Sequence, residues 1–413
     1  MRFIIPVFVA YLLVPRLTLG DNWPSWRGPH GTGVSAESNL PTTWSHEDNV
    51  HWKVPLPGPG NSTPVVWGDR VFVTCANPAG TTRSLLSFHF ADGTKRWQAD
   101  VHYADEEKSH KTNPQCSPSP VTDGHCVAAW FGSAGLHVYD MDGKKLWEAD
   151  LGKFEHIWGY AASPVIYQDL VILSAGPGLS AFLVAFDKQT GKEVWRQSPP
   201  ESISEKVDEF RGSWATPVFY QDGNRTLMLC SLPLQLLALD PTTGEEVWRC
   251  RGPSKLCYAS PLVQDDIVVM MCGYHGPSMA VRTGGSGDVT ESHRLWINED
   301  KKLNPQRVGS GVIVGDYIYI LNEPGIAWCM DLKTGQIQWE QRLGGKSWSS
   351  MIHAAGHLYA VNMDGDCFVL AADPQECKVL HTNKVGELTR ASLAPANGKI
   401  LIRTYEHLYC IGK

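Results

Sequence analysis

One pattern of eleven residues constrains the fold of this 413-residue sequence more than any other feature. It reads small-x-Asp-x-x-Thr-Gly-x-x-x-Trp and occurs without gaps at 185–195, 238–248 and 329–339. Two weaker copies, at 87–97 and 137–147, keep the spacing but have Asp-Gly at the turn. Self-similarity at a roughly fixed period predicts a repeat architecture.

The chemistry of the pattern is that of a β-hairpin. Apolar residues alternate before the turn, as a half-buried strand requires. Asp187 can accept hydrogen bonds from the amides of its own turn, and Gly191 can adopt the positive φ that such a turn needs. A Trp at the end of each second strand predicts a large packing surface that a neighbouring unit must cover.

A second signature, Ser/Thr-Pro followed by Val or Leu and an apolar strand, marks the start of each unit. The eight starts, three of them decayed, are Thr63, Ser119, Ser163, Thr216, Ser260, Ser310, Ser350 and Ser392. Four short strands in each unit of about 40–55 residues are typical of a propeller. The last unit has room for only three strands, so we expect the strand around Trp52 to complete it and close the ring.

These patterns predict an all-β, eight-bladed propeller of four-stranded blades over residues 50–413. Seven blades is the alternative, because 281–293 interrupts the hairpin of the fifth unit. Residues 21–49 are expected to brace the body. Residues 1–20 resemble a secretory signal peptide, which predicts a periplasmic or secreted protein with no membrane span once the signal is removed. An uncleaved membrane anchor is the alternative. We expect the protein to be a monomer.

Charge and cysteine content narrow the partners. The net charge is −7 and the isoelectric point is about 6.1, which argues against nucleic acid. The eleven cysteines are an odd number, so at least one thiol has no partner within the chain. Their pairing cannot be derived from the sequence.

The Asp-x-x-Thr-Gly-x-x-x-Trp unit resembles the tryptophan-docking repeat of quinoprotein (PQQ) dehydrogenases and their relatives in the WD40/YVTN-like propeller superfamily. With WPSWRGP at 23–29, the sequence resembles secreted bacterial PQQ-like repeat proteins, which are often labelled as similar to BamB. Two departures stand out. Quinoprotein alcohol dehydrogenases typically carry a vicinal Cys-Cys pair, and BamB-type subunits are typically lipoproteins. This sequence has no adjacent cysteines and no cysteine after the apolar run at 3–14.

Candidate site residues follow from the expected loop positions. Residues just before each first strand are expected to rim the axial channel: Trp158, Arg211, Trp214, Lys255, Tyr258, Arg307, Lys346, Trp348 and Arg390. Basic groups beside flat rings suit a planar polyanion such as PQQ. The alternative is that they are ordinary loop charges and packing rings.

Other chemistry has weaker signals. Glu323, Asp364 and Glu406 are carboxylates in loops of the same face, and Gly284 to Asp288 offers backbone groups for an anion or metal, or simply a flexible loop. We predict a non-catalytic envelope scaffold that binds a protein or peptide, with no catalytic residue, metal or cofactor. The alternative is a PQQ-dependent dehydrogenase with Ca²⁺, and a carbohydrate-binding role is the third hypothesis.

Overall fold

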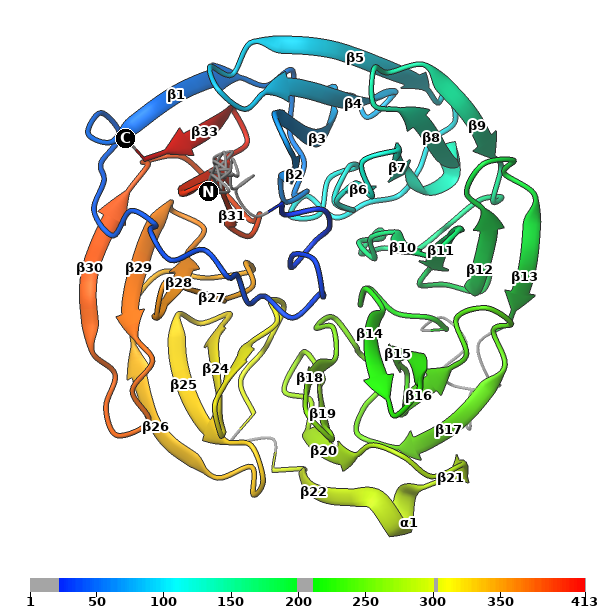
Figure 1. The fold of residues 1–413 in the computed structure, drawn as a ribbon, viewed down its shortest axis with the longest axis vertical. Helices are drawn as coiled ribbons and strands as arrows, with labels where there is room; N and C mark the ends of the chain where they lie inside the picture. The colour runs from blue at the N-terminus through cyan, green and yellow to red at the C-terminus, as the bar shows by residue number, and fades with distance from the viewer. Residues whose placement is uncertain (1–21, 199–210, 301–303, 413) are drawn as a thin grey trace, which may run out of the picture.

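The computed structural model describes residues 22–198, 211–300 and 304–412. They form eight sheets arranged around a central axis, each with four antiparallel strands, so the predicted eight-bladed propeller is confirmed (Figure 1). The predicted signal at 1–20 lies outside the described residues. Within the described ranges, no helix combines the length and apolarity that a membrane crossing requires.

The first four blades follow one another in chain order. Blade 1 is β2 (Val65–Trp67), β3 (Arg70–Ala76), β4 (Thr82–His89) and β5 (Lys95–His102). Blade 2 is β6 (Val121–Thr122), β7 (Cys126–Trp130), β8 (Leu136–Asp140) and β9 (Lys145–Ala149), with a 3₁₀ turn at Gly132–Ala134. Blade 3 is β10 (Val165–Tyr167), β11 (Leu170–Ala175), β12 (Phe182–Asp187) and β13 (Glu193–Gln197). Blade 4 is β14 (Val218–Asp222), β15 (Arg225–Leu232), β16 (Gln235–Leu239) and β17 (Glu246–Arg251).

The second half repeats the arrangement. Blade 5 is β18 (Leu262–Gln264), β19 (Ile267–Met271), β20 (Ser278–Arg282) and β22 (Arg294–Asn298). Blade 6 is β23 (Val312–Val314), β24 (Tyr317–Asn322), β25 (Ile326–Asp331) and β26 (Ile337–Arg342). Blade 7 is β27 (Ile352–Ala354), β28 (His357–Val361), β29 (Asp366–Ala371) and β30 (Val379–Lys384). Blade 8 is β31 (Ala394–Ala396), β32 (Lys399–Arg403), β33 (His407–Ile411) and β1 (Val50–Pro55).

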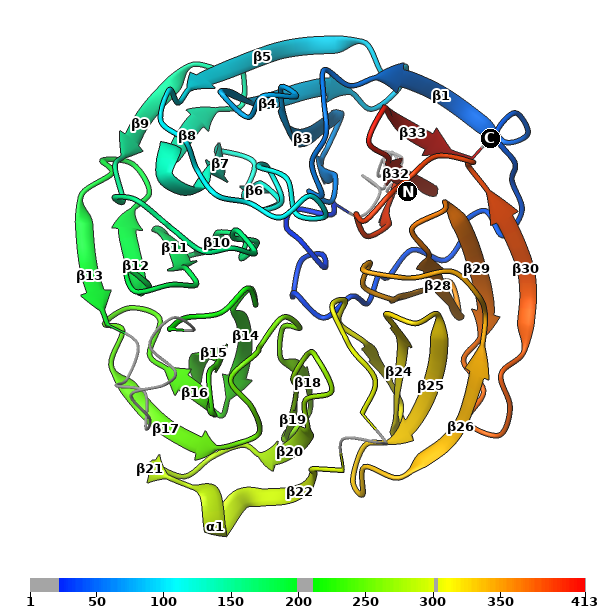
Figure 2. The same cartoon turned by 180° about the vertical axis from the view of Figure 1, so that it is seen from behind.

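Closure of the ring takes the predicted form. β1 pairs antiparallel with β33, and Trp52 lies opposite Cys410 in the register. The outermost strand of the last blade therefore precedes every other strand in the chain (Figure 2). This pairing removes two open sheet edges.

The Trp residues join the blades at the rim. In five joints the indole N–H donates to a backbone carbonyl of the next blade at 2.8–3.0 Å. The indole also packs on the turn glycine of that blade, so closely that a Cβ added to this glycine would lie 2.6–2.7 Å from the ring. The Trp–Gly pairs are Trp52–Gly93, Trp97–Gly143, Trp147–Gly191, Trp195–Gly244 and Trp296–Gly335. Gly at the turn is thus required twice, for its positive φ and for the ring that packs on it.

The Ser and Thr residues of the eight starts form a second set of joints at the axis. In seven of the eight joints the backbone N–H of one start donates to the hydroxyl oxygen of the next at 2.8–3.2 Å, and the last of these seven, from Ser392 to Thr63, completes the circle. In the remaining joint, Ser260 Oγ donates to the carbonyl of Thr216 at 2.7 Å. This serine–threonine ring explains why a hydroxyl precedes each first strand.

The insertion in the fifth unit does not remove a blade. Its residues Gly287–Asp288 form β21, which pairs parallel with β17 and lies opposite Trp248 and Arg249. A short helix, α1 (Thr290–His293), follows. Trp248 is fully buried and donates to the Tyr220 hydroxyl of its own blade, so this joint differs from the other rim joints.

The segment before β1 crosses the axis on the face opposite the inter-blade loops. Figure 1 shows it in dark blue, passing the middle of the ring before it runs outward to β1. Trp23 and Arg27 are each 1 % exposed. The Arg27 guanidinium donates to the carbonyls of Gly31 and Gly311, and its burial lowers its pKa to about 9. This segment therefore packs against the body.

Candidate functional site

A cavity of about 400 Å³ opens on the axis, on the face that carries the inter-blade loops. Its volume is within the range of known ligand sites. Residues from all eight blades and from the segment before β1 line it: Trp26, Asn61, His110, Thr112, Asn113, Ser117, Ser119, Trp158, Ala161, Ser163, Trp214, Thr216, Tyr258, Tyr274, Gln306, Val308, Glu323, Lys346, Trp348, Arg390 and Ser392. The serine–threonine ring contributes four of these residues.

Aromatic rings form much of the wall. The rings of His110 and Trp158 lie 4.6 Å apart, and Trp214 meets Tyr258 edge-on at 5.0 Å. Backbone contacts hold these rings in place, because Trp214 Nε1 donates to the carbonyl of Gly159 at 3.0 Å and Asn113 Nδ2 donates to the carbonyl of Trp158 at 2.7 Å. The wall is therefore positioned before any ligand arrives.

Three charged side chains line the cavity. Arg390 lies over the rings of Trp348 and Tyr405, at 5.5 and 5.2 Å, and it donates to the Tyr405 hydroxyl. The Lys346 ammonium is 3.9 Å from the Glu323 carboxylate, and the Lys346 side chain is 70 % exposed. The cavity thus carries one more positive than negative charge among its described residues.

The structure separates the predicted rim residues into two groups. Trp158, Trp214, Tyr258, Lys346, Trp348 and Arg390 line the cavity. Arg211 and Lys255 are partly exposed but are not among the lining residues.

Arg307 points into the protein instead of the cavity. It is fully buried, and it donates to Asn304 Oδ1 at 2.8 Å and to the carbonyls of Gly276 and Cys272 at 3.0 and 3.3 Å. Burial lowers its pKa to about 10. Its role here is to hold the loop between β19 and β20.

The sequence analysis did not single out several lining residues. Tyr274 lies between the second and third strands of blade 5, whereas our list was restricted to residues before first strands. Asn61, His110 and Asn113 lie in the inter-blade loops, and Trp26 comes from the bracing segment. The same-face rule for the loops would have found Tyr274.

The described lining does not fit a Ca²⁺–PQQ pair. Ca²⁺ takes about six to eight oxygen ligands, usually several of them carboxylates. Of the three candidate carboxylates, only Glu323 lines the cavity. The backbone N–H of Asp364 donates to Asn362 in a turn, and Glu406 belongs to another cluster. The cations available to PQQ are Arg390 and Lys346, but Arg390 already donates to Tyr405 and Lys346 already pairs with Glu323.

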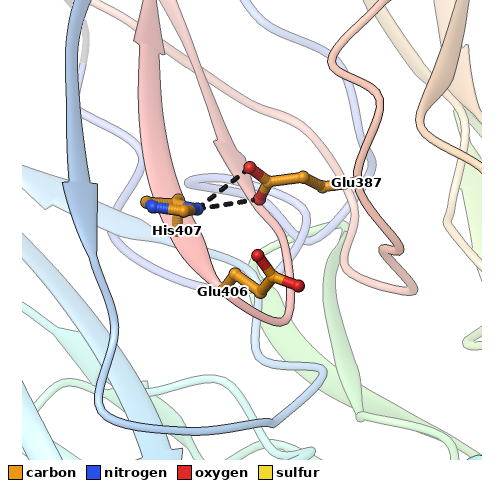
Figure 3. A group of neighbouring side chains, drawn as sticks. All are labelled: Glu387, Glu406 and His407. Carbon is orange, nitrogen blue, oxygen red and sulfur yellow. Dashed lines mark hydrogen bonds and ion pairs between the residues drawn. The ribbon is translucent and has the colours of Figure 1, made fainter.

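Glu387, Glu406 and His407 form a group with metal-ligand chemistry beside β33 (Figure 3). The Glu387 carboxylate already accepts hydrogen bonds from four side chains at 2.6–3.0 Å: Lys53, Thr404, His407 and Tyr409. Burial alone would raise the pKa of Glu387, but these bonds outweigh it and lower the pKa to about 2. Because Lys53 comes from β1, this cluster fastens the closing strand; it is not an open metal site.

Comparisons with known proteins agree with the fold. A family model described as outer membrane protein assembly factor BamB matches residues 34–184, 180–284 and 286–404. The BamB of Burkholderia pseudomallei (strain K96243) is 25 % identical in an alignment 304 residues long that covers 62 % of this chain and 71 % of that protein.

Solved structures of two kinds are similar. The BamB of Moraxella catarrhalis has a TM-score of 0.60 and 16 % identity, over 87 % of this chain and 96 % of that one. The quinohemoprotein alcohol dehydrogenase of Comamonas testosteroni has a TM-score of 0.69 and 12 % identity, over 94 % and 80 %. A europium-containing methanol dehydrogenase has a TM-score of 0.68 and 12 % identity, over 92 % and 89 %. At these identities the likeness is one of fold. The family model covers most of the chain, and the protein belongs to the PQQ-repeat family described as outer membrane protein assembly factor BamB.

Proposed function

We propose that this protein is a non-catalytic scaffold of the cell envelope, and that it binds a protein or peptide partner with its loop-rich face. One observation carries the proposal: large apolar side chains stand exposed in the loops of that face. Their exposed fractions are 66 % for Ile157, 42 % for Trp158, 70 % for Leu179, 62 % for Tyr274 and 41 % for Leu388. Large apolar side chains exposed on one face are typical of interaction surfaces.

The cavity gives this surface a centre. Trp158 and Tyr274 belong to both the exposed set and the cavity wall. Trp and Tyr are enriched among the residues that dominate binding energy, especially in pockets at the middle of an interface. An apolar anchor side chain of the partner would enter the cavity, while amides such as Asn113 and Gln306 would face its backbone. The family's description as an assembly factor supports a protein partner for this chain as well.

Photo-crosslinking tests the proposal directly. A benzophenone amino acid placed at Leu179 or Tyr274 is expected to yield adducts in envelope preparations. Val194 and Leu146 are the matched controls, because they are 50 % and 45 % exposed but lie on the rim strands β13 and β9. Adducts from the rim positions alone, or from none, would contradict the proposal. With the benzophenone amino acid at Leu179, the double change Trp158→Ala and Tyr274→Ala is expected to remove the adducts.

The quinoprotein hypothesis remains the second candidate, supported by Arg390 stacked on Trp348 in the cavity and by the dehydrogenase-like fold. Titration with PQQ and Ca²⁺ separates the two. Saturable binding that Arg390→Ala and Lys346→Ala abolish would favour the dehydrogenase. Unchanged Trp fluorescence at tens of micromolar PQQ is the result expected for a scaffold.

A further inference from the structure

Two buried cysteines face each other behind the cavity wall. Cys257, in the loop between β17 and β18, and Cys272, directly after β19, have their sulfurs 3.5 Å apart. Both side chains are fully buried. Of the eleven cysteines, all of which the structure describes, no other two have sulfurs in hydrogen-bonding contact with each other. Cys250, which flanks the same loop as Cys257, instead has its thiol near the carbonyl of Arg251.

The surroundings of the pair are prearranged for a cross-link. The backbone N–H of Gly273 donates to the carbonyl of Leu256 at 2.9 Å, so the two chain segments already lie side by side. Arg307 holds the Cys272 segment through the carbonyls of Cys272 and Gly276. The sulfurs need to approach by about 1.5 Å to reach a disulfide bond length of about 2.05 Å.

The two segments also carry part of the cavity wall. Tyr258 follows Cys257 directly, and Tyr274 comes two residues after Cys272. Tyr274 and His275 both have positive φ, of 44° and 55°, a conformation that costs free energy in residues other than Gly. A covalent link at Cys272 would hold this turn and its exposed Tyr274 in place.

We propose that Cys257 and Cys272 form a disulfide that fixes the Tyr258 and Tyr274 segments of the cavity wall. The oxidant is a small-molecule or protein disulfide. One cysteine thiolate attacks it and releases one thiol, and the second thiolate then attacks the mixed disulfide and releases the other. The pair loses two protons and two electrons, and the oxidant's disulfide is reduced to two thiols. Burial raises the pKa of the Cys257 thiol, so the exchange belongs to a stage before this blade is fully packed.

Mass spectrometry of the full chain tests this inference. The protein is refolded in a mixture of reduced and oxidised glutathione, denatured, treated with an alkylating reagent and digested without reduction. The expected result is a cross-linked Cys257–Cys272 peptide, lighter by two hydrogens than the sum of its parts, with the other cysteines alkylated. Alkylated Cys257 and Cys272 peptides in correctly folded protein would overturn the proposal.

Variants keep the test independent of folding yield and of the proposed function. Reduction is expected to lower the Tm of the wild-type protein by on the order of 5 °C, and to leave unchanged the Tm of the double variant Cys257→Ser and Cys272→Ser. Cys230→Ser is the matched control, since Cys230 is also buried but has no sulfur facing it, and this variant should keep the response to reduction. An equal response of all three proteins would contradict the cross-link, whatever partner the loop face binds.

Discussion

The rim and the axis of this propeller are joined by different chemistry. At the rim, five of the joints are large apolar contacts in which an indole packs on a turn glycine and donates one hydrogen bond. At the axis, each joint is a single hydrogen bond between a hydroxyl group and the backbone. The rim tolerates exceptions, such as Trp248 under β21, whereas the serine–threonine ring has a member in all eight blades. The rim joints are therefore strong but variable, whereas the axial joints are weak but occur between all neighbouring blades.

The largest effect is expected from removing a rim indole. Trp195 is 8 % exposed, packs on Gly244 and donates to the carbonyl of Pro241 at 3.0 Å. Trp195→Ala should lower the free energy of unfolding by about 3–5 kcal/mol, because it leaves a cavity between two blades. Urea denaturation followed by circular dichroism measures this. Trp195→Phe is the control. Its free energy of unfolding should fall by about 1 kcal/mol for the lost hydrogen bond and by a further amount for the smaller ring. Equal decreases in the two variants would show that the hydrogen bond alone stabilises the joint.

The turn glycine is expected to come next. Gly191→Ala places a Cβ 2.7 Å from the Trp147 ring at a φ of +70°. We expect a loss of about 2–4 kcal/mol from overlap and positive φ together. Gly223 has a φ of +61° with nothing within 4 Å of the added Cβ, so Gly223→Ala isolates the conformational part, about 1 kcal/mol. Thermal unfolding gives the Tm of each variant. Similar decreases in Tm would mean that the Trp147 indole moves aside to accommodate the added Cβ.

The contact between β1 and β33 contains a third kind of joint, the ionic cluster around Glu387. Glu387→Gln should lower the free energy of unfolding by about 1–3 kcal/mol at neutral pH, since bonds from Lys53 and His407 lose a charged acceptor. The folded-state pKa of Glu387, about 2, is below its ordinary value of 4.5. Its contribution is therefore complete above about pH 4.5 and is lost as the pH falls toward 2.

The free energy of unfolding of the wild type and of Glu387→Gln, measured as a function of pH, checks this direction. The gap between wild type and Glu387→Gln should narrow as the solution is acidified. A gap that stays constant down to pH 2 would show that the carboxylate charge does not stabilise this contact. Glu406, exposed in the same group, provides the control change Glu406→Gln, which should have little effect.

The smallest effect is expected at the axis. Ser163→Ala removes the acceptor of the Ser119 backbone N–H, a bond of 2.9 Å between buried groups. The loss should be about 1–2 kcal/mol, the cost of an unsatisfied buried donor. Ser286→Ala, at an exposed position, is the control for urea denaturation. A loss as large as that of Trp195→Ala would show that the ring acts as one cooperative unit.

The sequence was sufficient for the architecture because its period is visible. The eight Ser or Thr starts and the Trp spacing predicted eight blades, and the missing fourth strand of the last unit predicted the role of Trp52. Parallel pairing of Gly287 with Trp248 was not predictable, because a two-residue strand in a glycine-rich insertion has no periodicity. The turn glycines were expected for their φ, but the neighbouring indole on them depends on how blades pack.

The site was predicted less completely, because side-chain direction is not a property of chain position. Trp214 and Arg307 both lie just before a first strand, yet Trp214 faces the cavity and Arg307 turns inward. The difference comes from Asn304 and the carbonyls of the β19–β20 loop, which give Arg307 buried acceptors. Contacts between residues 31 and 35 positions apart, as here, decide the direction of the side chain.

Because β1 pairs with β33, the ring can close only in a chain that includes both strands. Both circles of joints pass through this one place, at Trp52 on the rim and at Ser392 to Thr63 on the axis. A protein cut or stopped before β33 would leave the edges of β1 and β32 unpaired and open to proteases or to other chains. Proteases or chaperones that recognise unpaired strand edges would thus distinguish a truncated chain from a complete propeller.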